Sequence, residues 1–243
     1  MTHYAAIGTF VNEKQHQVNI TKAYYLGKYE VSVKEWENIT GKNLLPGIGT
    51  SRIPAATITF SEIQDFIDKL NKKENRTFPD RPKYRSPTEA EWEYAARLDE
   101  DGNSTLTAWS FGNDFNELAN YATYNKEGNI TLIASGGTKN ATGLGFYDIY
   151  GHLFEYVSDW YDDDYGLTNE ELADITVDPK GPSNGIKRIV RGGSYLSKDS
   201  APSKQNNGWA SMRSAYRSGV EQYNEKYNNV GFRLLLEIPD NAQ

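Results

Sequence analysis

Two short phrases near the C-terminal end of the chain enclose a stretch of unusual composition. The first phrase is residues 191–195 (RGGSY) and the second is residues 230–234 (VGFRL). The residues between them are mostly Ser, Asn, Tyr, Lys, Gln, Asp and Glu. Tyr supplies rigid contact area, and Ser and Asn supply adaptable hydrogen bonds, as in antibody binding loops. The pattern predicts a binding surface held at both ends by strands, and a polar loop without a function is the alternative.

The length and composition of the chain narrow the class of protein. Its 243 residues are 37% hydrophobic and 13% aromatic, including 17 Tyr, so a core can be built from large flat side chains. No Pro-, Gly- or Ser-rich linker divides the chain, and we expect a single domain over residues 1–243. The net charge is −7 and no Lys/Arg run is longer than a pair, so we expect no nucleic-acid partner.

Two absences in the sequence restrict the protein further. No apolar run approaches the ~18 residues that cross a bilayer, and no charged-then-apolar leader opens the chain. We therefore expect no transmembrane segment, export signal or lipid anchor in this chain. The chain also has no Cys, which excludes a disulfide, a thiol nucleophile and a thiolate metal ligand.

Three segments carry the signals of short helices. Spacing at i, i+3, i+4 and i+7 predicts an amphipathic helix over residues 62–73, whose apolar residues are Ile63, Phe66, Ile67 and Leu70. Ser32 with Glu35, and Thr88 with Glu91, have the spacing of capping boxes, which predicts that a helix begins at each place.

The rest of the chain predicts strands joined by loops. Residues 98–145 are rich in Asn, Gly and Thr without periodicity, which predicts long loops. Residues 146–161 place aromatic side chains around a turn at Gly151 and end in an expected strand. Aromatic and β-branched residues also predict strands within residues 23–31, 188–191 and 231–237.

Four phrases together resemble the formylglycine-generating, sulfatase-modifying-factor branch of the C-type lectin-like fold. They are YLGKYEV at 25–31, RSPTEAEWEYAAR at 85–97, GFYDIYGHLFEY at 145–156, and RGGSY at 191–195 followed by GFR at 231–233. The resemblance covers nearly the whole chain and implies an α+β fold with short helices around small antiparallel sheets and many loops. The chain departs from the family at residues 152–156, where it has HLFEY in place of the usual NVWEW.

The resemblance implies an oxidase mechanism that this chain lacks the residues to perform. The family's oxidase works through cysteines just after the RGGSY phrase, and this chain has Ser197 where the first would fall. Serine neither binds copper as a thiolate does nor exchanges disulfides. We therefore expect no catalytic residues and no required cofactor. The alternative is an oxidoreductase, either formylglycine-generating-enzyme-like or iron-dependent and sulfoxide-synthase-like. The three His residues of this chain are too scattered to suggest an iron site, and they are His3, His16 and His152.

The chain is also similar to a second branch of the same fold, the treponemal-type variable proteins of diversity-generating retroelements. In these proteins adenine-directed mutagenesis rewrites codons in a C-terminal repeat that ends in a phrase like residues 228–233. Changing the adenines of an Asn codon gives Ser, Asp, Tyr, His, Thr or Gly. The resemblance implies a receptor- or adhesin-like binding protein with a variable region at 191–237, an unknown protein or surface ligand, and a location at the bacterial cell surface or outside the cell.

The predicted ligand-binding positions come from the polar and aromatic residues of this region. They are Ser197, Asp199, Asn206, Asn207, Trp209, Ser211, Tyr216, Ser218, Tyr223 and Tyr227. Trp209 and Tyr216 are amphipathic enough to belong partly to the core instead. The arginines are expected to fasten loops by binding carbonyl or carboxylate groups, rather than to bind ligand, and they are Arg191, Arg213, Arg217 and Arg233.

The resemblance also implies a structural calcium site. The family's ligands carry over to Asp148, Gly151, Leu153 and Glu155, which would offer two carboxylates and two backbone carbonyls to a hard cation. The alternative is that the Asp caps a turn and the Glu satisfies backbone amides.

Overall fold

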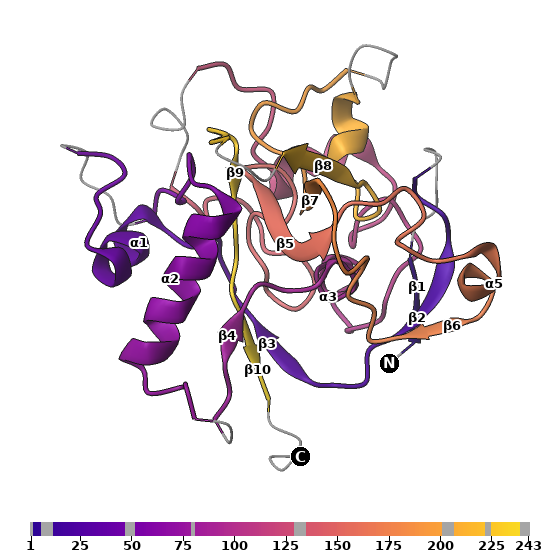
Figure 1. Cartoon of the computed structure of the whole chain (residues 1–243). Helices are drawn as coiled ribbons and strands as arrows, with labels where there is room; N and C mark the ends of the chain where they lie inside the picture. Colours follow the sequence, from indigo (N-terminus) through magenta and orange to yellow (C-terminus); the bar gives the residue numbers. More distant parts are fainter. Residues whose placement is uncertain are drawn as a thin grey trace.

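The computed structural model describes residues 2–5, 12–46, 52–78, 81–128, 135–200, 207–221 and 225–238. In these residues short helices surround small sheets that are joined by long loops (Figure 1). One three-stranded sheet has the order β1-β2-β6, and its strands are Thr2–Ala5, His16–Asn19 and Ile175–Val177. Another has the order β3-β10-β4, and its strands are Tyr24–Leu26, Leu235–Glu237 and Tyr84–Arg85.

The three predicted helices are present, and each begins at a capping box. Helix α1 (Val33–Thr40) is capped by Ser32 and α3 (Glu89–Ala96) by Thr88. Helix α2 (Phe60–Lys73) begins two residues earlier than expected, because the Thr59 hydroxyl accepts the Glu62 amide while the Glu62 carboxylate accepts the Thr59 amide. The other helical segments are single turns, namely η1 (Phe115–Glu117), α4 (Leu118–Tyr121), α5 (Asn169–Leu172) and η3 (Gly208–Met212).

A four-stranded sheet brings the two terminal phrases of the polar segment together. Its order is β8-β7-β5-β9, and its strands are Ser218–Glu221, Lys187–Arg191, Phe154–Trp160 and Val230–Gly231. Strand β5 pairs antiparallel with β7 and parallel with β9, so Glu155 lies opposite both Arg191 and Gly231. The two phrases therefore lie on either side of one central strand (Figure 1).

Two predicted strands are shorter in the structure than in the sequence pattern. The strand expected at 231–237 is divided into β9 and β10, because Phe232 and Arg233 between them turn into the interior and are fully buried. The strand expected at 23–31 is regular only in β3. Beyond β3 the chain continues beside the same neighbour through isolated bonds, such as the Val31 amide to the Phe232 carbonyl at 2.9 Å.

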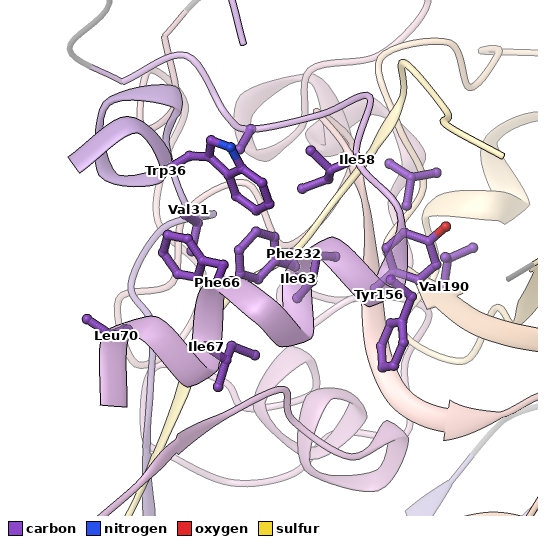
Figure 2. Packing of buried hydrophobic residues seen from close by; sticks show 13 residues of the cluster. Val31, Trp36, Ile58, Ile63, Phe66, Ile67, Leu70, Tyr156, Val190 and Phe232 are labelled. Carbon is purple, nitrogen blue, oxygen red and sulfur yellow. The ribbon is translucent and has the colours of Figure 1, made fainter. Parts of the chain in front are cut away.

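Aromatic rings fill the core between α1, α2 and the C-terminal strands. Trp36 stacks on Phe66 with centroids 5.2 Å apart, and Phe232 meets both rings edge-on (Figure 2). A second buried cluster gathers around Trp92 and Trp109. Within the region expected to be loops at 98–145, the described residues Trp109, Leu118 and Ala122 belong to this cluster, with Leu118 in the short helix α4. The Trp109 indole donates to the Met212 carbonyl at 2.9 Å. Across the described ranges, no helix combines the length and apolar character required to cross a membrane.

Candidate ligand-binding face and its buried support

The polar segment crosses one end of the molecule. It leaves β7 after Arg191, forms η3 and β8, and returns to the sheet at β9. In Figure 1, η3 and β8 lie at the top, while β10 lies at the opposite end. Gly192 and Gly193 form the expected tight turn, with φ of 91° and 78°. A Cβ at Gly192 would lie 2.7 Å from the Ile149 carbonyl oxygen, so only glycine fits there.

Arg191 holds the middle of this segment from the protein interior. Its side chain is fully buried, and its guanidinium donates to the Ser214 carbonyl at 2.6 Å and to the Ala215 carbonyl at 3.2 Å. It also pairs with the carboxylates of Glu89 at 3.2 Å and Glu93 at 2.6 Å, both on α3. This confirms the prediction that Arg191 anchors carbonyl and carboxylate groups.

Arg217 and Arg213 provide two further anchors. Arg217 makes a two-point contact with Glu89, from Nε at 2.6 Å and from Nη2 at 2.8 Å, which is the strong geometry of a guanidinium–carboxylate pair. Its Nη1 also donates to the Asp162 carbonyl at 2.9 Å. Arg213 pairs with the buried Glu13 at 2.7 Å. Both arginines fasten the segment, as expected.

Two of the predicted ligand contacts lie in the interior instead. Ser197 and Ser211 are buried. The Ser197 hydroxyl accepts the Ser194 amide at 3.0 Å and receives the Ser211 hydroxyl at 2.8 Å, while Ser211 lies 2.9 Å from the Gly208 carbonyl. This corrects the expectation that they face solvent, because both hydroxyls satisfy polar groups inside the turn.

The two amphipathic aromatic residues of the segment are placed mainly in the core. Tyr216 is only 7% exposed, and its ring centre lies 6.4 Å from that of Phe154. Burial raises the pKa of its hydroxyl, which accepts the Asn207 side chain at 2.5 Å. Trp209 is partly exposed and packs against Trp109, with centroids 5.9 Å apart. The alternative in which these two residues belong to the core is therefore correct for Tyr216 and partly correct for Trp209.

The remaining described positions reach the surface. Asp199 and Asn207 are exposed, and Ser218 and Tyr227 are partly exposed. The Asp199 carboxylate accepts the Asn125 amide group at 2.8 Å. The predicted contacts Asn206 and Tyr223 lie outside the described residues. The predicted positions that reach solvent are Asp199, Asn207, Ser218 and Tyr227, together with the partly exposed Trp209, and we call this set the display face.

On β5, Glu155 has partners that differ from those of a calcium ligand. Its Oε2 accepts the Trp92 indole at 2.7 Å and Arg233 Nε at 2.6 Å, and its Oε1 accepts Arg233 Nη2. Both carboxylate oxygens are occupied, and a buried guanidinium balances their charge. The arrangement fits the alternative in which Glu155 is a structural hydrogen-bond acceptor, and it also confirms Arg233 as a carboxylate anchor.

Asp148, the other predicted carboxylate ligand, lies beside Glu30 and His152. His152 Nδ1 is 2.5 Å from a Glu30 oxygen, and the Leu153 amide donates to the other Glu30 oxygen at 3.0 Å. Burial raises the pKa of the Glu30 carboxyl above its ordinary value. Gly151 contributes its amide to the Gly192 carbonyl at 2.8 Å. Sequence reasoning missed Glu30 and His152 as neighbours of Asp148, although the unusual His in place of the family's Asn was visible.

Comparisons with known proteins agree with this architecture. Residues 4–238 match the model of the sulfatase-modifying factor enzyme 1-like domain. The formylglycine-generating enzyme of Thermomonospora curvata is 32% identical over 126 residues, which cover 48% of this chain and 40% of that protein. The corresponding enzyme of Streptomyces coelicolor is also 32% identical, over 48% of this chain and 37% of that protein. The chain thus spans less than half the length of these two relatives.

Solved structures resemble the chain over almost its whole length. Treponema denticola variable protein 1 superposes with a TM-score of 0.77 at 23% identity, covering 98% of this chain and 92% of that one. PvdO from Pseudomonas aeruginosa superposes with a TM-score of 0.67 at 19% identity, with the same two coverages. These matches confirm the predicted α+β, C-type lectin-like fold of the formylglycine-generating-enzyme type. The chain belongs to the sulfatase-modifying factor enzyme 1-like family.

Proposed function

We propose that this protein is a ligand-binding member of its family, of receptor or adhesin type, and that the display face recognises the ligand. The proposal is supported by the likeness of the fold to Treponema denticola variable protein 1. By the same likeness, residues 191–237 are proposed to be a variable region that is diversified at its display-face positions and not at its buried anchors. The ligand is proposed to be a protein or another surface molecule, and the protein to act at the bacterial cell surface or outside the cell.

The observation that carries the proposal is that different residues of the polar segment anchor its backbone and reach solvent. Arg191 holds the segment through the main-chain carbonyls of Ser214 and Ala215. Main-chain contacts do not depend on which side chain a neighbouring position carries. Asn207, which is exposed, and Ser218, which is partly exposed, lie on either side of this held backbone. Their side chains can therefore vary and serve recognition.

A catalytic role of the oxidase type is not part of the proposal. The chain has no Cys to bind copper as a thiolate. Ser197, which stands where the family's first cysteine would fall, uses its hydroxyl in the bonds to Ser194 and Ser211. The family also contains formylglycine-generating enzymes, so the test is direct: the protein is incubated with a sulfatase-motif peptide, oxygen and copper. Formation of an aldehyde on the peptide would favour the oxidoreductase alternative.

The proposal also makes a prediction about stability. Asp199, Asn207 and Ser218 are replaced with Ala, and Tyr227, which packs partly against the core, is replaced with Phe. The combined change should shift the free energy of unfolding by no more than about 2 kcal/mol, since surface positions contribute ~0.5 kcal/mol each. A matched variant replaces the buried Ser197, Ser211 and Ser214 with Ala and should lose more. If the exposed set destabilises the protein as much as the buried set, the display face is part of the scaffold and the proposal fails.

We further propose that residues 1–243 form one domain. Strand β10 near the C-terminus pairs with β3 and with β4, which links distant parts of the chain in one sheet. Limited proteolysis should leave a single core of nearly full length, and two stable fragments of similar size would contradict this.

A further inference from the structure

Three buried side chains come together beneath the start of β5. Glu30 reaches the cluster from the segment before α1, and Asp148 and His152 reach it from the turn before β5. One ligand-type atom of each residue lies within 4.8 Å of those of the other two. Each residue is at most 6% exposed. Two carboxylates and an imidazole are thus enclosed together, away from water.

One oxygen of this cluster lacks a hydrogen-bond partner. Asp148 Oδ2 accepts the Gly137 amide at 2.5 Å, whereas Oδ1 is buried and receives no hydrogen bond from the described residues. An unsatisfied buried carboxylate oxygen destabilises the folded state. Such an oxygen is stabilised when it binds a cation.

The charges around the cluster leave room for a cation. Glu155 is nearby but its charge is balanced by Arg233, with which it shares two hydrogen bonds. Arg233 lies within electrostatic range of Glu30 and Asp148, but among the described residues neither carboxylate shares a hydrogen bond with a guanidinium. The Glu30 oxygens accept the Leu153 amide and contact His152 Nδ1, so a bound ion would replace the Glu30–His152 contact. Buried carboxylates in proteins are paired or coordinate metals, so a cation suits this cluster as a further positive partner.

A cavity lies beside the cluster, and Glu30 is the cluster residue that lines it. The cavity, of about 300 Å³, is lined by residues that include Tyr29, Glu30, Arg52 and Gly136. A Cβ at Gly136 would lie 3.2 Å from Asp148 Oδ2 and 3.7 Å from the His152 ring. The glycine therefore places the cavity wall directly over the cluster without covering it with a side chain.

We propose that Glu30, Asp148 and His152 bind a divalent transition cation such as Zn²⁺ or Mn²⁺. An imidazole nitrogen with carboxylate oxygens suits these ions. Calcium takes six to eight oxygen ligands and gains nothing from an imidazole. The ligand set differs from the one that the family resemblance implies, because it uses Glu30 and His152 in place of Glu155. The ion would be structural, since it joins the segment before α1 to the turn before β5.

The test measures melting temperature after chelation and re-addition of single cations. Zn²⁺ or Mn²⁺ should raise the melting temperature by about 5 °C at a hundred times its Kd, with one ion bound per chain by elemental analysis, and Ca²⁺ and Mg²⁺ should have little effect. If no cation raises it, or if Ca²⁺ raises it most, the proposal is wrong. If no cation raises the melting temperature, a protonated His152 balances the charge of the two carboxylates instead.

Two single variants, of which Asp148→Asn is isosteric, locate the ion. Asp148 and His152 have φ of 55° and 60°, a left-handed conformation that Asn tolerates. Asp148→Asn and His152→Asn should therefore fold and lose both the bound ion and the thermal shift. Asp163→Asn, at the exposed middle position of the acidic run 162–164, is the control and should keep both. Retention of the shift in the first two variants would overturn the proposal.

A spectroscopic measurement on the unaltered protein covers the case in which the variants fail to fold. Mn²⁺ bound to the wild-type chain should give an electron spin echo signal modulated by one directly bound nitrogen, from His152. A bound Mn²⁺ without a nitrogen ligand would contradict the assignment.

Discussion

The guanidinium of Arg191 donates to the carbonyl oxygen of Ser214 at 2.6 Å, which ties the end of β7 to the middle of the polar segment 23 residues later. Both residues are fully buried. The same guanidinium pairs with Glu93 on α3. One side chain thus joins the scaffold helix to the segment that carries the display face.

Removing this anchor should destabilise the protein. Arg191→Met leaves two main-chain carbonyls without their donor and two buried carboxylates with one partner fewer, and we expect a loss of about 3–5 kcal/mol in the free energy of unfolding. Chemical denaturation measures it. Lys187→Met, on the same strand but exposed and 3.9 Å from Glu221, is the matched control, and its effect should stay within about 0.5 kcal/mol. Equal effects would show that Arg191 is not an anchor.

The buried serines should behave differently from the exposed polar residues. Ser197→Ala removes the acceptor of the Ser194 amide and of the Ser211 hydroxyl, and should cost about 1–3 kcal/mol. Ser218→Ala, at a partly exposed position, should change the free energy of unfolding by no more than ~0.5 kcal/mol. Thermal melts of the two single variants measure both stability changes, and the melting temperature of Ser197→Ala should fall further than that of Ser218→Ala. A neutral Ser197→Ala would indicate that this serine is available for binding after all.

Asp159 should make stability depend on pH. Burial, with the nearby charge of Glu89 as a second cause, raises the pKa of Asp159 to about 7. Between the unfolded-state pKa of about 3.9 and this value, the folded state holds a proton that the unfolded state has released. The contribution of Asp159 to stability therefore falls as pH rises through this window.

Asp159→Asn should remove the loss of stability that ionisation of Asp159 causes as pH rises. The Asn side chain carbonyl can still accept the Glu89 amide, which bonds Asp159 at 3.0 Å. Relative to wild type, the variant should gain stability from pH 4 to pH 8, by about 1–3 kcal/mol at the upper end. The pKa of Asp65 is lowered by Lys69, so Asp65→Asn should instead lose stability relative to wild type as pH rises. A pH-independent difference between Asp159→Asn and wild type would contradict the assignment.

Local signals in the sequence were sufficient for the helices. The capping boxes at Ser32 and Thr88 involve residues only three positions apart, so the sequence contains both partners. The start of α2 was placed at Ser61 rather than Thr59 because both residues can cap, and only the geometry shows that Glu62 closes the box with Thr59. The fold class followed from the order of the four phrases.

The site depended on contacts that no local pattern contains. Arg191 was expected to bind carboxylates, but its partners Glu89 and Glu93 lie about a hundred residues away. Ser197 and Ser211 have the same residue type as the partly exposed Ser218, and only tertiary packing makes them internal. The resemblance placed Glu155 with Asp148, whereas the ion pair with Arg233 separates their roles.

The central claim is that the display face can change without changing the fold, and a displayed library tests it most directly. Asp199, Asn207, Ser218 and Tyr227 are randomised together on the surface of yeast, and the protease-resistant fraction is counted before selection against an arbitrary protein such as lysozyme. A control library randomises the buried Ser197, Ser211 and Ser214. The account predicts that most of the first library resists protease and yields binders, whereas most of the second is degraded. Equal degradation of both libraries would contradict it.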